Sequence, residues 1–258
     1  PFIDGFLAPS HWAAAVLREQ FPEHEVRVAQ HGVHPEIHFP YRQDYLERVA
    51  EYRDGEFRVM HFTSSLGQRK GTLLLLAAWR HLIASGALPS TARLLIVSNP
   101  LGVNEYMWRS HEMGVQAETV DIVANPEAPQ SALAAALRHA HLICQPSRAE
   151  GFGLIPLEAR ACGVLVAMTN CTGHADHWSP VGTVAIKHGP LAPMDDYPGA
   201  VAPSVTMCAV RDAIGEAYAR WLDLAEEAIE TADKVREEWS WERRNAHVLR
   251  GLVDEVDD

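Results

Sequence analysis

The sequence predicts a doubly wound α/β fold, in which helices cover both faces of a parallel sheet. From residue 57 onward, short apolar segments of strand length alternate with longer segments of helical pattern, and this alternation is typical of parallel βαβ units. Ligands of such sheets bind beyond the carboxyl ends of the strands. The expected order is strand 57–63, helix 71–85, strand 92–98, helix about 103–113, strand 119–123, helix 129–138, strand 140–145, helix 153–162 and strand 164–168.

Smaller elements precede this alternation. Residues 2–8 are expected to form a strand, followed by a helix that runs to about Gln20 with Ser10 as its N-cap. A second strand is expected at 26–29. The stretch that follows contains Gly32 and ends at Pro40, and its composition indicates a connector rather than core.

The end of the chain has a different character. Residues 179–204 are rich in Pro, Gly and Asp and are expected to form a loop. Two acidic helices are expected at about 208–237. A last segment begins at Trp241 with Ser240 as N-cap, and Trp241, Val248 and Leu252 would form an apolar stripe on it, although an ordinary surface helix has the same pattern.

Composition narrows the class of protein. The chain has 258 residues, 47% of them hydrophobic, which suffices for one large domain or two modest ones. Its formal net charge of −12 argues against nucleic acid and against an anionic bilayer as partners, because both attract Lys and Arg. No apolar run is long enough for an integral membrane segment.

The cysteines indicate a cytoplasmic location. Cys144, Cys162, Cys171 and Cys208 show no Cys-x-x-Cys spacing, and Cys144 falls in an apparently buried strand. Free thiols in a reducing compartment are therefore expected. The chain begins at Pro1 and shows no signal-peptide pattern, so we expect a piece of a longer protein.

The most informative stretch is 146–163, where Glu150 and Glu158 stand eight positions apart around the turn Gly151-Phe152-Gly153. An apolar strand precedes the turn, and good helix formers follow it. A strand-to-helix turn of this kind leaves backbone N–H groups unpaired at the positive end of a helix, where a phosphate can bind. A carboxylate accepts two hydroxyl donors from one sugar, so Glu150 and Glu158 suit a sugar better than a phosphate. Alternatively, each carboxylate caps or pairs on the helix surface.

A second candidate segment is 63–71, which follows the strand 57–63 and contains Arg69 and Lys70. A fixed cation there would stabilise a departing phosphate better in the transition state than in the ground state. By itself the pair is better explained as a solvated charged turn that caps the next helix. Its combination with the Glu150 turn favours a phosphate site.

Together these segments resemble the donor-binding signature of the retaining glycosyltransferases of family 4, which have the GT-B fold and use nucleotide-diphosphate sugars. The resemblance implies that Glu150 contacts the transferred sugar, that Glu158 holds the ribose and that Lys70 supports the diphosphate. Ser65 stands where the family has an arginine, and Arg69 is the candidate substitute. The expected catalytic residues are Lys70, Glu150 and Arg69, and the expected substrate-binding residues are Ser64, Ser65, Ile122, Val123, Gly151, Phe152, Gly153, Leu154 and Glu158.

Ile122 and Val123 belong to a third strand end, which flanks the nucleobase in the family, although core packing is the more common role of an apolar strand residue. The resemblance also implies the domain plan. Residues 1–40 would be the end of an N-terminal acceptor domain and the connector, 41–238 the Rossmann-like donor domain, and 239–258 a C-terminal helix that returns toward the first domain. The rest of the acceptor domain would be missing.

The expected partners are a UDP-, GDP- or ADP-linked sugar and an acceptor that the sequence does not identify, and no cofactor is expected. A non-catalytic nucleotide-sugar-binding or regulatory module on the same fold is the alternative. An oxidoreductase is disfavoured because no Gly-x-Gly-x-x-Gly follows the first strand. Two clusters contain metal-ligand residue types without a clean ligand spacing, so no metal is expected. They are His31, His34 and His38, and Cys171, His174, Asp176 and His177.

Overall fold

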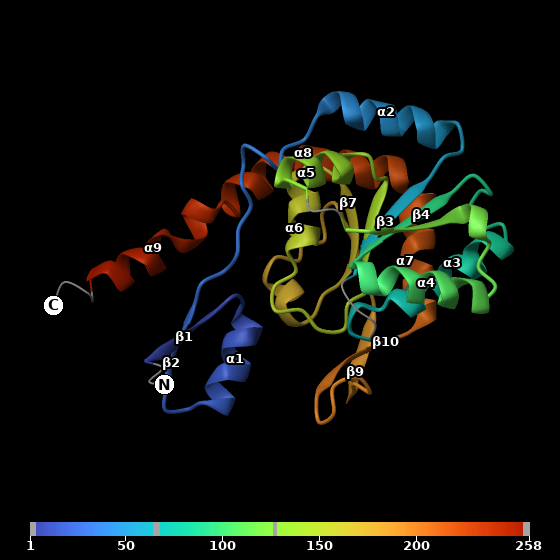
Figure 1. The fold of residues 1–258 in the computed structure, drawn as a ribbon. Coiled ribbons are helices and arrows are strands. Elements are labelled where there is room, and N and C mark those ends of the chain that lie inside the picture. Colours follow the sequence, from blue (N-terminus) through green and yellow to red (C-terminus); the bar gives the residue numbers. More distant parts are fainter. Residues whose placement is uncertain (1–3, 64–67, 126–127, 255–258) are drawn as a thin grey trace.

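A computed structural model describes residues 4–63, 68–125 and 128–254. A six-stranded parallel sheet forms its centre, with strand order β5-β4-β3-β6-β7-β8 (Figure 1). The strands are β3 (Arg58–Phe62), β4 (Arg93–Ser98), β5 (Val120–Ala124), β6 (Leu142–Gln145), β7 (Leu165–Thr169) and β8 (Thr183–Ile186). The chain first adds strands outward from β3 to β5 and then returns to add β6 to β8 on the other side. The order in which strands are added to the sheet therefore reverses between the neighbours β3 and β6. Such a reversal is the switch point at which doubly wound sheets bind ligands.

Helices cover both faces of the sheet (Figure 1). On one face lie α3 (Thr72–Ala84), α4 (Pro100–Glu112) and α7 (Met207–Ala219), and on the other lie α5 (Gln130–Arg138) and α6 (Leu154–Ala161). The largest buried cluster includes Leu76 and Trp79 of α3 and Ile214 of α7. A second cluster, between the sheet and α5 and α6, contains Leu137 and Met168. Strands buried on both faces are the reason that the sequence shows continuous apolar runs.

Two further helices, α2 (Arg42–Arg53) and α8 (Trp221–Glu238), close the amino ends of the strands. The indole N–H of Trp221 donates to the carbonyl of His141, just before β6, at 2.7 Å. The buried Arg48 of α2 donates to the carbonyls of Arg138 and Gly163, which precede β6 and β7. With this end covered, the carboxyl ends of β3 and β6 are the accessible end of the switch point.

The N-terminal elements form a separate small sheet beside the main one (Figure 1). Strands β1 (Gly5–Ala8) and β2 (Glu25–Val28) are parallel, and α1 (His11–Gln20) connects them. Ser10 caps α1 by accepting from Ala13 N, which confirms the predicted N-cap. Helix α9 (Trp241–Asp254) starts at the connector, where Trp241 N donates to Val33 O, and Asn245 donates to Gln30 O.

The strands and helices predicted between 57 and 169 are confirmed, with boundaries shifted by a few residues. The predicted loop 179–204 is wrong, because it holds β8 and most of a hairpin of β9 (His188–Pro193) and β10 (Val201–Val205). Its Pro and Gly residues lie largely in this exposed hairpin and concealed the short buried strand before it. Helix α2 has no counterpart among the predicted elements.

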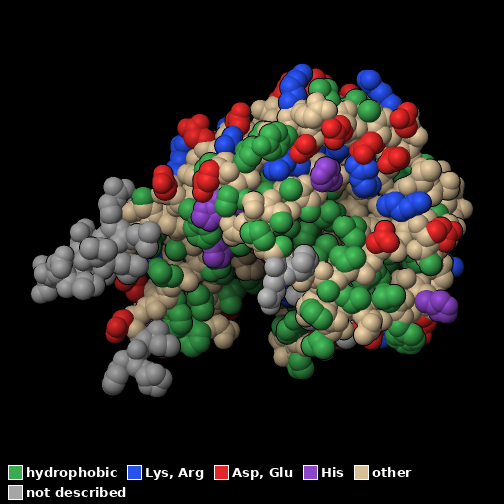
Figure 2. Space-filling view, turned by 45° about the horizontal axis from the view of Figure 1, so that its top comes forward, with side chains coloured by type: hydrophobic (Ala, Val, Ile, Leu, Met, Phe, Trp, Pro, Cys, Tyr) green, Lys and Arg blue, Asp and Glu red, His purple; other side chains and the backbone are tan. Residues whose placement is uncertain are grey.

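Charge is distributed over the surface without a dominant basic area in the view of Figure 2, where acidic and basic side chains are mixed on the upper part of the face. Within the described part of the chain, no helix combines the length and the apolarity needed to cross a membrane.

Candidate functional site

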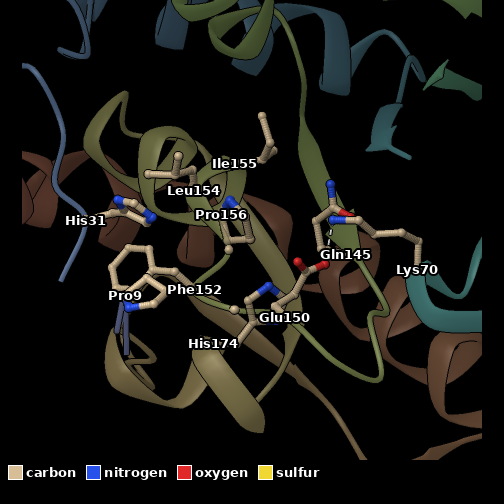
Figure 3. Close-up of a pocket in the computed structure, with 12 residues that line it drawn as sticks. Pro9, His31, Lys70, Gln145, Glu150, Phe152, Leu154, Ile155, Pro156 and His174 are labelled. Carbon is tan, nitrogen blue, oxygen red and sulfur yellow. Dashed lines mark hydrogen bonds and ion pairs between the residues drawn. The ribbon is translucent and has the colours of Figure 1, made fainter. Parts of the chain in front are cut away.

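A cavity of about 310 Å³ lies at the carboxyl ends of β3 and β6, at the switch point (Figure 3). The loop after β6 and the start of α6 supply most of its wall, while Lys70 reaches it from the loop after β3. The connector and the N-terminal part also contribute. The described lining residues are Pro9, His31, Lys70, Gln145, Glu150, Gly151, Phe152, Gly153, Leu154, Ile155, Pro156 and His174.

A close backbone contact holds the two loops together. Gly71 has φ +70°, and a Cβ there would lie 2.4 Å from Pro146 O, so only glycine fits between the loops. Beside it, Arg148 N donates to Arg69 O at 2.8 Å. This packing places the 3-10 helix η1 (Gln68–Lys70) against the loop that carries Glu150.

Lys70, Arg69 and Glu150 form a partly buried charge cluster, in which Figure 3 shows the contact between Lys70 and Glu150. Lys70 Nζ lies 2.5 Å from Glu150 Oε1, and an Arg69 guanidinium nitrogen lies 3.1 Å from Oε2. Burial of Glu150 works to raise the pKa of its carboxyl, but Lys70, together with His174 and Arg69, outweighs burial and holds that pKa below its ordinary value. The three predicted catalytic residues thus lie together, with Glu150 ionised.

The N-terminus of α6 opens into the same cavity. Its N-cap is Gly153, with φ +91°, and glycine has no side chain to bond the first N–H groups of the helix. A Cβ at Gly153 would lie 2.1 Å from His174 Cδ2, so the turn also needs glycine for space. The N–H groups of Leu154 and Ile155 and the helix dipole therefore favour an anion at this point.

The predicted ribose contact, Glu158, lies outside the cavity wall. It is absent from the described lining of the cavity, and its Oε1 is 3.7 Å from His38 Nε2 of the connector. Both side chains are buried, and Glu158 Oε2 and both His38 ring nitrogens have no hydrogen-bond partner among the described residues. Burial raises the pKa of Glu158 to about 7 and lowers that of His38. The geometry does not bring Glu158 together with Glu150 and Lys70.

The two candidates on β5 point in opposite directions, as alternation along a strand requires. Ile122 packs against the main core cluster. Val123 instead lines a second, mostly apolar cavity of about 320 Å³ together with Phe62, Val97 and Leu133. Of these two residues, Val123 is therefore the one that lies at a cavity where a ligand could bind. The candidates Ser64 and Ser65 fall outside the described residues.

Each histidine cluster contributes one residue to the wall of the site, His31 and His174. Among the described residues, no group of three or more His, Cys, Asp and Glu side chains has metal-binding geometry. Burial lowers the pKa of His174 to about 4, and the buried His177 Nε2 lies 3.1 Å from Phe152 O. The four cysteines are free, and three of them are buried.

The sequence interpretation did not assign Pro9, His31, Gln145 or His174 to the cavity. His31 comes from the connector, and its ring meets that of Phe152 edge to face at 5.4 Å. His31 and His174 belong to the two clusters of metal-ligand residue types, and the segment 169–177, which contains His174, also resembles a loop near the donor in family 4. The position of both rings in the cavity wall depends on tertiary packing. In the sequence, the only local indication is the glycine at 153, which leaves room for the His174 ring.

The strand order, the cavity at the switch point and the open helix N-terminus define a Rossmann-like α/β protein suited to a phosphorylated ligand. The chain belongs to the family described as glycosyl transferases group 1, whose family model matches residues 57–208. This match confirms the family expected from the sequence, and the solved structures described next confirm the GT-B type of fold.

Among curated proteins, a D-inositol 3-phosphate glycosyltransferase of Kribbella flavida is 29% identical over 198 residues, covering 75% of this chain and 46% of the relative. One from Rhodococcus opacus is 33% identical over 120 residues, covering 45% and 26%. The chain thus spans less than half of these relatives.

Solved structures of glycosyltransferases share the fold, and two of them illustrate the similarity. HepE of Anabaena, solved in complex with UDP and glucose, superposes with a TM-score of 0.73 at 16% identity, over 98% of this chain and 63% of that one. Sucrose-phosphate synthase of Thermosynechococcus elongatus superposes with a TM-score of 0.71 at 18% identity, over 97% and 58%.

Proposed function

We propose that this chain supplies the donor site of a retaining, metal-independent glycosyltransferase that uses a nucleotide-diphosphate sugar. The observation that carries the proposal is the meeting of Lys70 and Glu150 beside the N-terminus of α6, in the cavity at the switch point. A cation and free N–H groups suit a diphosphate, and the adjacent carboxylate suits sugar hydroxyls. The family membership of the chain supports this division of roles.

In this proposal the diphosphate accepts hydrogen bonds from the N–H groups of Leu154 and Ile155. The Lys70 ammonium group moves from Glu150 to a phosphate oxygen. Bond cleavage leaves negative charge on the outer phosphate oxygen, which Lys70 and the helix N-terminus stabilise most when that charge is fully developed. Arg69, 3.1 Å from Glu150, stays with the carboxylate and keeps it ionised. Glu150 then accepts hydroxyl hydrogens from the transferred sugar.

The nucleoside would extend from the diphosphate toward the apolar cavity that Val123 lines. Glu158 is proposed to accept from the ribose hydroxyls. Its carboxyl group contacts His38 in this structure, so the ribose contact requires the side chain to turn. One similar protein was solved with UDP and glucose, and this makes UDP-linked sugars the first donors to test.

The configuration at the anomeric carbon is proposed to be retained because the acceptor hydroxyl attacks this carbon on the face that the diphosphate leaves. A donor phosphate oxygen takes the proton of the acceptor hydroxyl. Glu150 is bound by two cations and is assigned to sugar positioning. No carboxylate nucleophile is invoked.

The domain assignment remains part of the proposal. Residues 1–40 and 239–258 would belong with an acceptor domain, and 41–238 would form the donor domain. Because the chain spans less than half of its curated relatives, the acceptor is left open, and this chain by itself is expected to bind donor more readily than to transfer sugar.

The test has two stages. Calorimetry with UDP, GDP, ADP and their glucose conjugates should show saturable binding of one base family to this chain. Release of the nucleotide from the sugar conjugate by the full-length protein together with a glycosylated acceptor product, both lost in Lys70→Ala, would then establish transfer. Binding without any transfer by the full-length protein would favour the alternative, a non-catalytic nucleotide-sugar-binding module.

A further inference from the structure

Thr172 adopts an unusual backbone conformation beside the cavity. Among the described residues it is the one non-glycine residue with positive φ, at +53°. A β-branched side chain is strained in this left-handed region, where glycine or asparagine is usual. Such strain persists only where surrounding contacts fix it, and it concentrates at functional sites.

The contacts of Thr172 are directed at Glu150. Thr172 Oγ1 accepts a hydrogen bond from Glu150 N at 3.0 Å, and the next residue, Gly173, donates its N–H to Glu150 O at 2.9 Å. A Cβ at Gly173 would lie 2.5 Å from Gly151 O and from Phe152 N, so the two segments are in close backbone contact. Both backbone polar groups of Glu150 are therefore held from the same short segment.

The other end of this segment is anchored as well. Thr172 begins the 3-10 helix η3 (Thr172–Asp176), and Asp176 at its end accepts from His11 N at 3.0 Å and from Gln30 Nε2 at 2.6 Å. His11 starts α1 and Gln30 follows β2, so the N-terminal part of the chain holds η3 in place. This anchoring explains how the structure sustains the strained conformation at Thr172.

We propose that Thr172 is a positioning residue for Glu150, which its hydroxyl fixes in the orientation that meets the donor sugar. The methyl group of threonine restricts the rotation of its side chain, and Thr172 is 8% exposed, so its hydroxyl has little freedom. The backbone of Glu150 is fixed by Thr172 and Gly173, and the carboxylate is fixed by Lys70 and Arg69. This inference rests on the proposed function, because it assigns the sugar to Glu150.

Three substitutions separate the hydroxyl from the strain. Thr172→Ser keeps the hydroxyl, Thr172→Ala removes it and keeps a Cβ in the left-handed conformation, and Thr172→Gly removes both the hydroxyl and the strain. The readout is the ratio of the dissociation constant of UDP to that of UDP-glucose, measured by calorimetry. The same ratio is measured for GDP against GDP-glucose and for ADP against ADP-glucose. This ratio isolates the contribution of the sugar.

We expect Thr172→Ser to keep the wild-type ratio. In Thr172→Ala and Thr172→Gly the ratio should fall at least five-fold, because binding of the sugar is weakened. Affinity for the nucleotide alone should stay within two-fold of wild type. Thr172→Gly should melt at or above the temperature of Thr172→Ala. A ratio that is unchanged in the alanine and glycine variants, or that follows the melting temperature across all three, would overturn the inference.

A second measurement needs no ligand. Titration of the Glu150 carboxyl by carbon NMR should give a higher pKa in Thr172→Ala than in the wild type, because a loosened carboxylate loses contact with Lys70. An unchanged pKa would overturn the positioning role even if no donor is found. Conversely, a raised pKa in a protein that binds none of the nucleotides would uphold that role and contradict the proposed donor site alone.

Discussion

Substitution of Lys70 by alanine tests the charge cluster most sharply. The change deletes the ammonium group 2.5 Å from Glu150 Oε1. Breaking a buried ion pair costs about 3–5 kcal/mol when the remaining charge has no partner. Here Arg69 stays 3.1 Å from the carboxylate, and the Lys70 side chain is 21% exposed. We therefore expect a loss of about 1–2 kcal/mol in the free energy of unfolding at neutral pH.

The effect on ligand binding should be larger than the effect on stability. A hydrogen bond to a charged group contributes about 1.5–3 kcal/mol, which corresponds to a loss of roughly 10-fold to 150-fold in nucleotide affinity. Chemical denaturation gives the stability change, and calorimetry with UDP, GDP and ADP gives the change in affinity. Lys234→Ala is the matched control, because Lys234 is 74% exposed and lies 3.9 Å from Glu238. The control should change stability by less than about 0.5 kcal/mol and leave affinity unaltered.

The pH dependence gives this prediction its sign. The pKa of Glu150 is depressed in the folded protein, so its contribution to stability is present above the ordinary carboxyl pKa and is lost as pH falls through the folded value. The penalty of Lys70→Ala should therefore be largest near neutral pH and shrink in acid. Equal losses of stability and affinity in Lys70→Ala and Lys234→Ala would refute the reasoning.

Three other predictions follow from local geometry. In chemical denaturation, Gly153→Ala should lose about 1–3 kcal/mol more stability than Gly55→Ala. Both glycines have positive φ, but of the two only Gly153 has a neighbour, His174, that an added Cβ would meet. Equal losses in the two variants would contradict this clash. The raised pKa of Glu158, about 7 against an ordinary 4.5, means that stability should fall by up to about 3 kcal/mol as pH rises between these values. Glu158→Gln should flatten the profile, and a wild-type profile that is already flat would contradict this. Cys208, the one exposed cysteine, should react with a maleimide in the native protein before the buried thiols, and simultaneous reaction of all four in mass spectra would contradict the packing.

Most of the fold could be predicted because strands buried on both faces give apolar runs that stand out between helices. The order in which those strands pair is not visible in such runs. Helix α2 was missed because most of its residues are charged or polar, although Tyr45, Val49 and Tyr52 mark the face that packs on the core. Strand β8 was missed because it is four residues long and borders the exposed hairpin of β9 and β10.

The candidate site divides in the same way. Lys70 and Glu150 could be predicted because each follows a strand end, and parallel strands bring such ends together. Glu158 is one helical turn farther along α6, and its contact with His38 rather than with the cavity depends on tertiary packing. Thr172 gives no sign in the sequence, since its role depends on a backbone conformation that threonine rarely adopts.

A crystal structure of this chain with UDP and with UDP-glucose would test the central claim most directly. The account predicts the diphosphate within hydrogen-bond distance of the N–H groups of Leu154 and Ile155, with Lys70 Nζ moved from Glu150 to a phosphate oxygen. The glucose hydroxyls should lie on Glu150. A diphosphate bound elsewhere, or Lys70 still paired with Glu150 beside a bound ligand, would contradict it.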